Sequence, residues 1–151
     1  MITNVVIEGV DRVGKDSIGS YIDRLSNRLL PIGNRNVLST IVYAKKYGRD
    51  IDPDYLECMI KNYVNSGTLT ILLVADTNDL KLRGEITGEQ EVDYDGDQQR
   101  FMEEAMVLMS DYNAPLLIYS TTELTPYKVA TDIVKYVKEQ NDMEIKEMRG
   151  E

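Results

Sequence analysis

Short apolar runs alternate along the chain with stretches in which apolar residues recur every three or four positions. A short continuous apolar run bounded by polar residues is typical of a strand that is covered on both faces. Such runs predict buried strands at 5–7, 37–42, 68–75 and 116–119. The run at 68–75, which reads Thr-Leu-Thr-Ile-Leu-Leu-Val-Ala, is the most strand-like stretch of the chain.

Helical spacing of apolar residues predicts the segments between these strands. The first helix is expected to end before Pro31, and Asp52-Pro53 and Thr125-Pro126 are pairs typical of a helix start. The predicted helices cover about 15–30, 52–63, 101–112 and 125–138.

Two segments lack such a pattern. Residues 76–96 are polar, acidic and glycine-containing, and we expect them to form a mobile excursion. Residues after Lys138 are charged, and we expect this end of the last helix to fray.

Strands that alternate with helices favour an α/β fold with three layers (α/β/α) and a reduced parallel sheet of about four strands. The glycine and lysine motif at 9–17, described below, indicates that this fold is of the P-loop NTPase type. We expect one domain at 1–140 and a charged C-terminal tail at 141–151. Ligands of such sheets bind at the carboxyl ends of the strands. Gly9 follows the first predicted strand and therefore lies where this architecture places a ligand.

Composition narrows the chemistry. The chain has 151 residues, no histidine and one cysteine, Cys58, which excludes histidine general bases, serine–histidine triads and cysteine-built zinc sites. The net charge of -9 argues against nucleic acid and anionic membranes as partners. The N-terminus lacks the pattern of a signal peptide and no apolar run could span a bilayer, so we expect a cytoplasmic protein.

The strongest motif is the segment 9–17, Gly-Val-Asp-Arg-Val-Gly-Lys-Asp-Ser. Its first seven residues match the phosphate-binding pattern G-x-x-x-x-G-K, and they lie between an apolar strand and an amphipathic helix, as that pattern requires. Lys15 supplies a positive charge to the phosphates. The backbone amides donate hydrogen bonds to the phosphate oxygens, and the helix N-terminus adds its partial positive charge. The predicted nucleotide-binding residues are Gly9, Asp11, Val13, Gly14, Lys15, Asp16 and Ser17.

A hydroxyl that binds Mg²⁺ normally follows the lysine of this motif. Here Asp16 stands in that place and Ser17 comes next. Either Asp16 reaches the metal through water or Ser17 takes the role, and the sequence leaves both open. ATP and Mg²⁺ are the cofactors that we expect.

The longer string 6–15, Val-Ile-Glu-Gly-Val-Asp-Arg-Val-Gly-Lys, resembles the P-loop of thymidylate kinases, because Glu8, Asp11 and Arg12 lie outside the generic pattern. The pair Lys15-Asp16 is similar to phage-type deoxynucleoside monophosphate kinases. A weaker resemblance continues through 52–75, through a lid-like segment at 82–95 and through the helix at 98–109.

The resemblance implies roles for individual residues. Lys15 would hold the phosphates of ATP, and Arg12 would reach the transferred phosphoryl group, which makes these two the expected catalytic residues. Asp11 would accept a hydrogen bond from the acceptor sugar, and Tyr94 would lie beside that sugar. Family members form homodimers, so the resemblance also implies a homodimer.

The chain departs from the family on the acceptor side. It lacks the family's R-E-P-G run, and the segment read as its second strand continues Ser-Thr-Ile-Val-Tyr where the family has Asp-Arg-Tyr. Basic residues nearby offer a replacement anion site, but ordinary surface charges are the favoured interpretation; they are Arg35, Lys45, Lys46 and Arg49.

Three hypotheses follow. The first is a nucleoside monophosphate kinase of nucleotide biosynthesis that phosphorylates dTMP, or another deoxynucleoside monophosphate, with ATP. The second is a catalytically degenerate relative that binds nucleotide or a protein partner as an inhibitor or scaffold. The third is a P-loop phosphotransferase with a reshaped acceptor pocket.

Overall fold

A four-stranded parallel sheet forms the centre of the computed structural model, which describes residues 1–87 and 93–151. The strand order is β2-β1-β3-β4. Val6 of β1 pairs with Gly33 of β2 on one side and with Thr70 of β3 on the other, and all three strand pairs are parallel. The strands are β1 (Asn4–Glu8), β2 (Ile32–Asn34), β3 (Thr68–Val74) and β4 (Leu116–Ser120).

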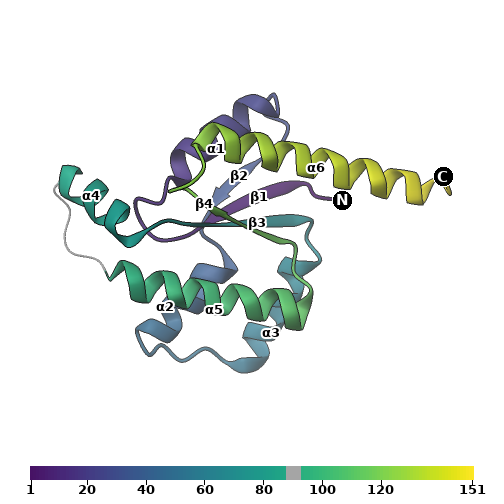
Figure 1. The fold of residues 1–151 in the computed structure, drawn as a ribbon. Coiled ribbons are helices and arrows are strands. Elements are labelled where there is room, and N and C mark those ends of the chain that lie inside the picture. The colour runs from purple at the N-terminus through teal and green to yellow at the C-terminus, as the bar shows by residue number, and fades with distance from the viewer. Residues whose placement is uncertain (88–92) are drawn as a thin grey trace.

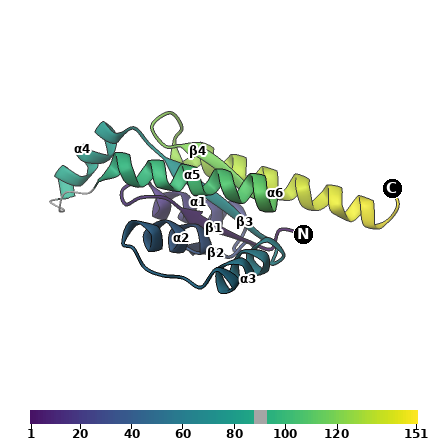
Figure 2. The ribbon, with the colours of Figure 1, turned by 90° about the horizontal axis from the view of Figure 1, so that it is seen from below.

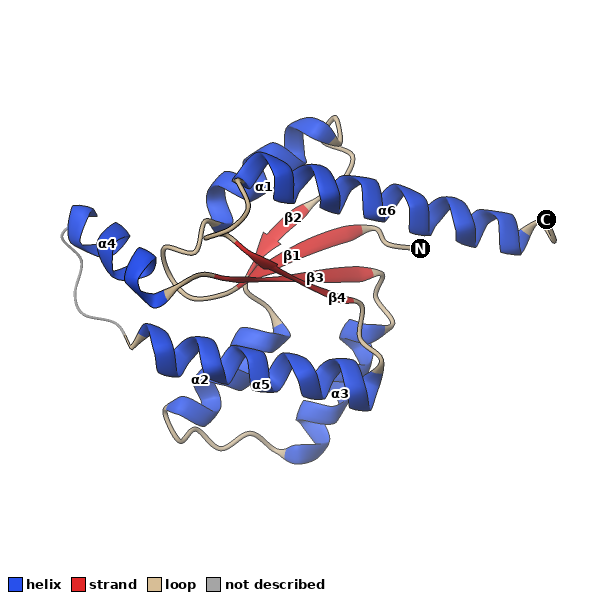
Figure 3. Cartoon of the chain, viewed as in Figure 1, coloured by secondary structure: helices blue, strands red, loops and turns tan. Residues whose placement is uncertain are grey.

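Helices cover both faces of this sheet (Figures 1 and 3). On one face lie α1 (Lys15–Leu25) and α6 (Pro126–Met148), which pack against each other. On the other face lie α2 (Val37–Lys46), α3 (Pro53–Val64) and α5 (Tyr94–Tyr112), as the view from below shows (Figure 2). The three-layer α/β fold with about four parallel strands is therefore confirmed.

The remaining helix, α4 (Thr77–Thr87), follows β3 and lies beyond the carboxyl ends of the strands (Figure 1). It occupies part of the segment in which we expected a mobile excursion: residues 77–87 form a helix, and α5 begins at Tyr94. The mobility of this segment stays a prediction. The rest of the expectation concerns 88–92, which lie outside the described residues.

The segment 37–42 is not a strand but the first part of α2. Its apolar residues suit either structure, but in the helix Leu38, Ile41 and Val42 all reach the core. The second strand is instead β2, three residues long, and it lies directly before this helix. β-Branched residues raise strand propensity only weakly, and here tertiary packing overrides it.

The ends of two helices also differ from expectation. α1 ends at Leu25 rather than near residue 30, because Asn27 and Arg28 take left-handed backbone angles of 54° and 61° in φ. α6 does not end near Lys138 but continues to Met148, and its last turns extend past the edge of the sheet (Figure 1).

The core lies on both faces of β1 and β3: Val5, Ile7, Leu69 and Ile71 are fully buried on one face, and Leu72 is fully buried on the other. No helix among the described residues is long and apolar enough to cross a membrane. Because all strands are parallel, the segments that follow them meet at one edge of the sheet. The candidate phosphate loop lies at this edge.

Candidate phosphate-binding site

The turn between β1 and α1 contains two glycines with positive φ. Gly9 has a φ of 142°, and a Cβ atom placed there would lie 2.7 Å from the carbonyl oxygen of Leu73. Gly14 is the N-cap of α1 with a φ of 103°. Both positions require glycine, since side chains rarely adopt these angles and the first has no room for one.

A hollow of about 400 Å³ opens above this turn. It brings together most of the residues that the sequence predicted; its lining consists of Asp11, Arg12, Gly14, Lys15, Asp16 and Ser17. Gly9 lies against β3, and the side chain of Val13 is fully buried in the core, so these two contribute backbone rather than lining.

Lys15 is folded back over the loop. Its Nζ donates hydrogen bonds to the carbonyl oxygens of Gly9 and Val10, at 3.0 and 2.8 Å. Burial and, to a lesser extent, the nearby Arg35 lower the pKa of Lys15 to about 8, whereas Asp11 works in the opposite direction. The ammonium group of Lys15 is thus held by two backbone carbonyl oxygens of the loop.

Arg12 has a left-handed φ of 69° and its side chain lines the hollow. Its carbonyl oxygen accepts a hydrogen bond of 2.7 Å from Nη1 of Arg83, which lies on α4. Nη2 of Arg83 lies 3.5 Å from the carbonyl oxygen of Thr121, after β4. Arg83 therefore ties α4 to the loop, a role that the sequence did not suggest.

Arg35 also reaches the loop. Its Nη2 lies 2.7 Å from Oδ1 of Asp11, and its Nη1 donates to the hydroxyl of Tyr43 at 3.0 Å. The guanidinium also lies 5.3 Å from the centre of the Tyr43 ring. Burial lowers the pKa of Arg35, but the hydrogen bond and charge interaction with Tyr43, together with the charges of Asp11 and Glu8, outweigh burial, so the pKa is raised.

These contacts do not agree with the favoured interpretation of Arg35 as an ordinary surface charge. The other basic residues of that group point elsewhere. Lys45 and Lys46 form ion pairs with α5, to Glu104 at 2.5 Å and to Asp97 at 2.7 Å, and the Arg49 guanidinium lies 5.3 Å from the centre of the Tyr47 ring.

Glu8 is a buried acid beside the loop. It is the last residue of β1 and its side chain is fully buried. Its Oε1 accepts hydrogen bonds from the backbone amide of Asn36 and, at 3.4 Å, from the hydroxyl of Ser39. Its Oε2 has no hydrogen-bond partner among the described residues. Burial raises the pKa of Glu8, and these hydrogen bonds only partly oppose the shift.

Asp16 and Ser17 lie in the first turn of α1, where the sequence predicted them near a metal. Oδ1 of Asp16 lies 3.5 Å from Nδ2 of Asn34. In the described part of the chain, no cluster of three or more acidic or cysteine side chains could hold a metal alone. One carboxylate and one hydroxyl do fit Mg²⁺ that is carried by nucleotide phosphates, because Mg²⁺ takes few protein ligands.

Tyr94 lies at the start of α5 and is 4% exposed. It packs in the core and is not among the residues that line the hollow. Its expected place beside an acceptor sugar stays a prediction.

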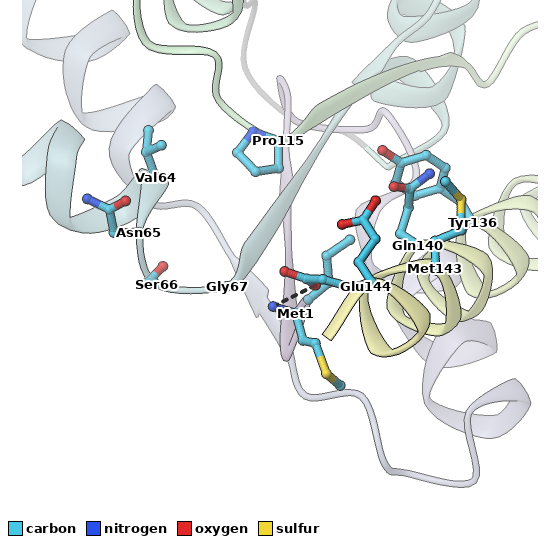
Figure 4. A pocket seen from close by; sticks show the side chains of 12 residues that line it. Met1, Val64, Asn65, Ser66, Gly67, Pro115, Tyr136, Gln140, Met143 and Glu144 are labelled. Carbon is cyan, nitrogen blue, oxygen red and sulfur yellow. Dashed lines mark ion pairs between the residues drawn. The ribbon is translucent and has the colours of Figure 1, made fainter. Parts of the chain in front are cut away.

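A second hollow, of about 610 Å³, lies at the opposite edge of the sheet (Figure 4). Segments that precede the strands line it, such as Gly67 and Pro115, together with the outer half of α6. Its lining includes none of the site residues that the sequence predicted.

Comparisons with known proteins support the fold. No protein-family model and no curated protein sequence matches the chain. One similar solved structure is the YorR protein of Bacillus subtilis in complex with phosphorylated GDP, with 20% identity and a TM-score of 0.66 over 93% of this chain and 98% of that one. Another is the thymidylate kinase of Candida albicans, with 15% identity and a TM-score of 0.50 over 92% of each chain.

Proposed function

We propose that this chain is a P-loop phosphotransferase that transfers the terminal phosphoryl group of ATP to a nucleoside monophosphate. The observation that carries the proposal is the loop of residues 9–17, where two glycines with positive φ shape the turn and Lys15 and Arg12 line one hollow at the start of a helix. Amides, a helix N-terminus and two cations are the groups that phosphoryl transfer requires, since it depends on positioning and charge rather than covalent chemistry.

On the donor side, Lys15 exchanges its two carbonyl partners for the phosphates of ATP. Arg12 offsets the charge that develops on the transferred group. Mg²⁺, held by Asp16 or Ser17 and the phosphates, supplies further charge neutralisation when bound. These residues act on the nucleotide together, because they line the same hollow.

On the acceptor side, Arg35 and Asp11 form the proposed binding pair. A guanidinium is suited to a phosphate and a carboxylate to a sugar hydroxyl. In this structure the two groups bind each other at 2.7 Å, so an acceptor with both a phosphate and a hydroxyl can satisfy both when it separates them. Arg35 thereby replaces the acceptor-binding segments that the sequence lacks.

The acceptor that we propose first is dTMP, on the resemblance of residues 6–15 to thymidylate kinases. The structure of the similar YorR protein contains phosphorylated GDP, so a guanine nucleotide should be tested as an acceptor in the same assay. A coupled assay of ADP release with dTMP, dGMP, dCMP and dAMP in magnesium buffer tests the proposal. Lys15→Ala is the inactive control, and Lys81→Ala, on an exposed part of α4, is the matched control.

A nucleotide-binding protein without turnover is the second candidate. The Arg35–Asp11 pair favours it, because this contact engages both groups that an acceptor would need. The same experiment separates the two. ADP release that depends on a monophosphate supports the kinase, whereas calorimetric binding of ATP without ADP release supports the second candidate. Absence of any ATP binding would reject both.

A further inference from the structure

Glu8 connects two parts of the site that are distant in sequence. It ends β1 and directly precedes Gly9, the first residue of the phosphate loop. Its Oε1 contacts Asn36 and Ser39, which are 28 and 31 residues further along. The carboxyl group therefore lies between the loop and the start of α2.

The start of α2 depends on this contact. The first amides of a helix have no partner within the helix and need an acceptor from elsewhere. Asn36 is the N-cap residue, but its own side chain makes no capping hydrogen bond. Glu8 supplies the acceptor from β1 instead, through the amide of Asn36.

Arg35 lies between two such attachments. Its amide donates to the carbonyl oxygen of Ile7 at 3.2 Å, and the next amide donates to Glu8. Its φ is 61°, a left-handed value that a residue with a side chain keeps only where its surroundings hold it. The two attachments to the end of β1 fix this turn, and the turn aims Arg35 at Asp11.

We propose that Glu8 is a positioning residue for acceptor binding: it caps α2 from the end of β1 and so holds the turn that directs Arg35 to the loop. This inference rests on the proposed function for its kinetic consequence. Its structural consequence, the orientation of Arg35, does not depend on turnover.

The contacts indicate which variant keeps the role. Only Oε1 has partners, and it acts purely as an acceptor. Glutamine keeps that oxygen and the shape of the side chain, so Glu8→Gln should retain the cap. Alanine removes the acceptor that the amide of Asn36 uses, so Glu8→Ala should release the turn.

The kinetic test separates acceptor from donor binding. We expect Glu8→Ala to raise the acceptor KM by about tenfold or more, because a small displacement of a binding group costs such factors. The calorimetric Kd for ADP should stay within about twofold, since Lys15 and the loop glycines are unchanged. Glu8→Gln should have an acceptor KM close to that of the wild type.

Arg35→Ala serves as the reference for this effect. If Glu8 acts through Arg35, the double variant Glu8→Ala, Arg35→Ala should be no worse than Arg35→Ala alone. Additive losses would overturn the proposal. An equal loss of ADP binding in Glu8→Ala would also overturn it, because the role would then be general support of the loop.

A second measurement keeps the proposal testable if the protein shows no turnover or if Glu8→Ala unfolds. The NMR resonances of the Arg35 Nε–H and the Asn36 amide report the turn directly. In Ser39→Ala, which removes one partner of Glu8 and leaves the Asn36 contact, both should stay close to wild type. In Glu8→Gln the Arg35 resonance should also be retained; its loss there would reject the proposal, while failure of turnover alone would reject only the proposed function.

Discussion

At the scale of single residues, we expect the charge state of Lys15 to affect how strongly the loop binds an anion. Burial lowers its pKa to about 8, so the free protein has a neutral fraction of this lysine in mildly alkaline solution. Phosphates favour the charged form and raise that pKa again. Binding of nucleotide should therefore be linked to uptake of a proton.

We predict that ADP binding at about pH 8.5 takes up a fraction of a proton that is absent near pH 6.5. Calorimetry in two buffers of different ionisation enthalpy measures this uptake. Lys15→Arg is the control, since arginine stays charged throughout. Equal uptake by the wild type and this variant would show that another group is responsible.

The burial of Glu8 has a consequence for stability. In the unfolded chain this carboxyl ionises near its ordinary pKa of 4.5, whereas burial raises its pKa in the folded protein. A raised folded pKa contributes stability that is complete below pH 4.5 and is lost as the pH rises through the folded value. The charged groups that affect Glu8 or are affected by it are Arg35, Lys15 and Tyr63.

Glu8→Gln removes this titration. We predict that its Tm relative to wild type is higher at about pH 8 than at about pH 4, because only the wild type then carries the cost of a buried ionisable group. Thermal unfolding at both values measures the difference. A constant Tm difference across this range would mean that the pKa of Glu8 is the same in the folded and unfolded states.

At the scale of elements, the loop depends on its close approach to β3. A Cβ on Gly9 would lie 2.7 Å from the Leu73 carbonyl oxygen and 3.0 Å from Val13. We predict that Gly9→Ala abolishes ADP binding and lowers the Tm, because the loop must move away from the strand. Gly19→Ala, inside α1, is the matched control, since its Cβ meets Ile32 at 3.4 Å.

Alanine is also favoured over glycine by about 1 kcal/mol in a helix. Gly19→Ala should therefore unfold at the same temperature as wild type or higher, and calorimetry should give an unchanged ADP affinity. Retained ADP binding in Gly9→Ala would contradict the account of the loop given above.

The hydrogen bond of Arg83 to the loop joins α4 to the proposed nucleotide site. We predict that Arg83→Ala slows turnover roughly tenfold, which corresponds to about 1.4 kcal/mol of lost positioning. Amides of residues 12–15 should exchange hydrogen faster. Lys81 is an exposed residue of the same helix, so Lys81→Ala should change neither the turnover nor the exchange rates. Hydrogen exchange in Arg83→Ala that is as slow as in the wild type would argue against the contact.

At the scale of the whole molecule, the end of α6 is attached to the start of the chain. The amide of Ile2 donates to Oδ1 of Asn141 at 2.8 Å, and Nδ2 of Asn141 donates to the carbonyl oxygen of Ile2 at 2.9 Å. The terminal amine lies 2.9 Å from Glu144. The outer part of α6 therefore closes the edge of the sheet opposite the loop.

We propose that residues 1–140 fold without the segment 141–151, because Val129, Ile133 and Val137 supply the buried face of α6. Loss of two hydrogen bonds should lower the Tm by about 4 to 8 °C. Truncation after Ile145 keeps both Asn141 contacts and should have a smaller effect. An unfolded 1–140 chain, detected by circular dichroism, would show that the outer part of α6 belongs to the domain.

The sequence by itself determined the glycine and lysine motif of residues 9–17 between β1 and α1 and the α/β class of the fold. Both depend on local features: glycines at fixed spacing, a lysine next to them, and apolar runs that end where the loop begins. These features act over a few residues, so a linear pattern contains them completely. The buried strands β1, β3 and β4 follow from the same kind of local signal.

The tertiary structure alone decided what surrounds that loop. The segment 37–42 suits a strand or a helix by its own residues, and a carboxyl group from β1 caps it as α2. Arg35 and Arg83 are ordinary cations in the sequence, and only the parallel sheet brings them to the residues of the loop. Contacts between residues so far apart in the chain arise from packing, which no local pattern contains.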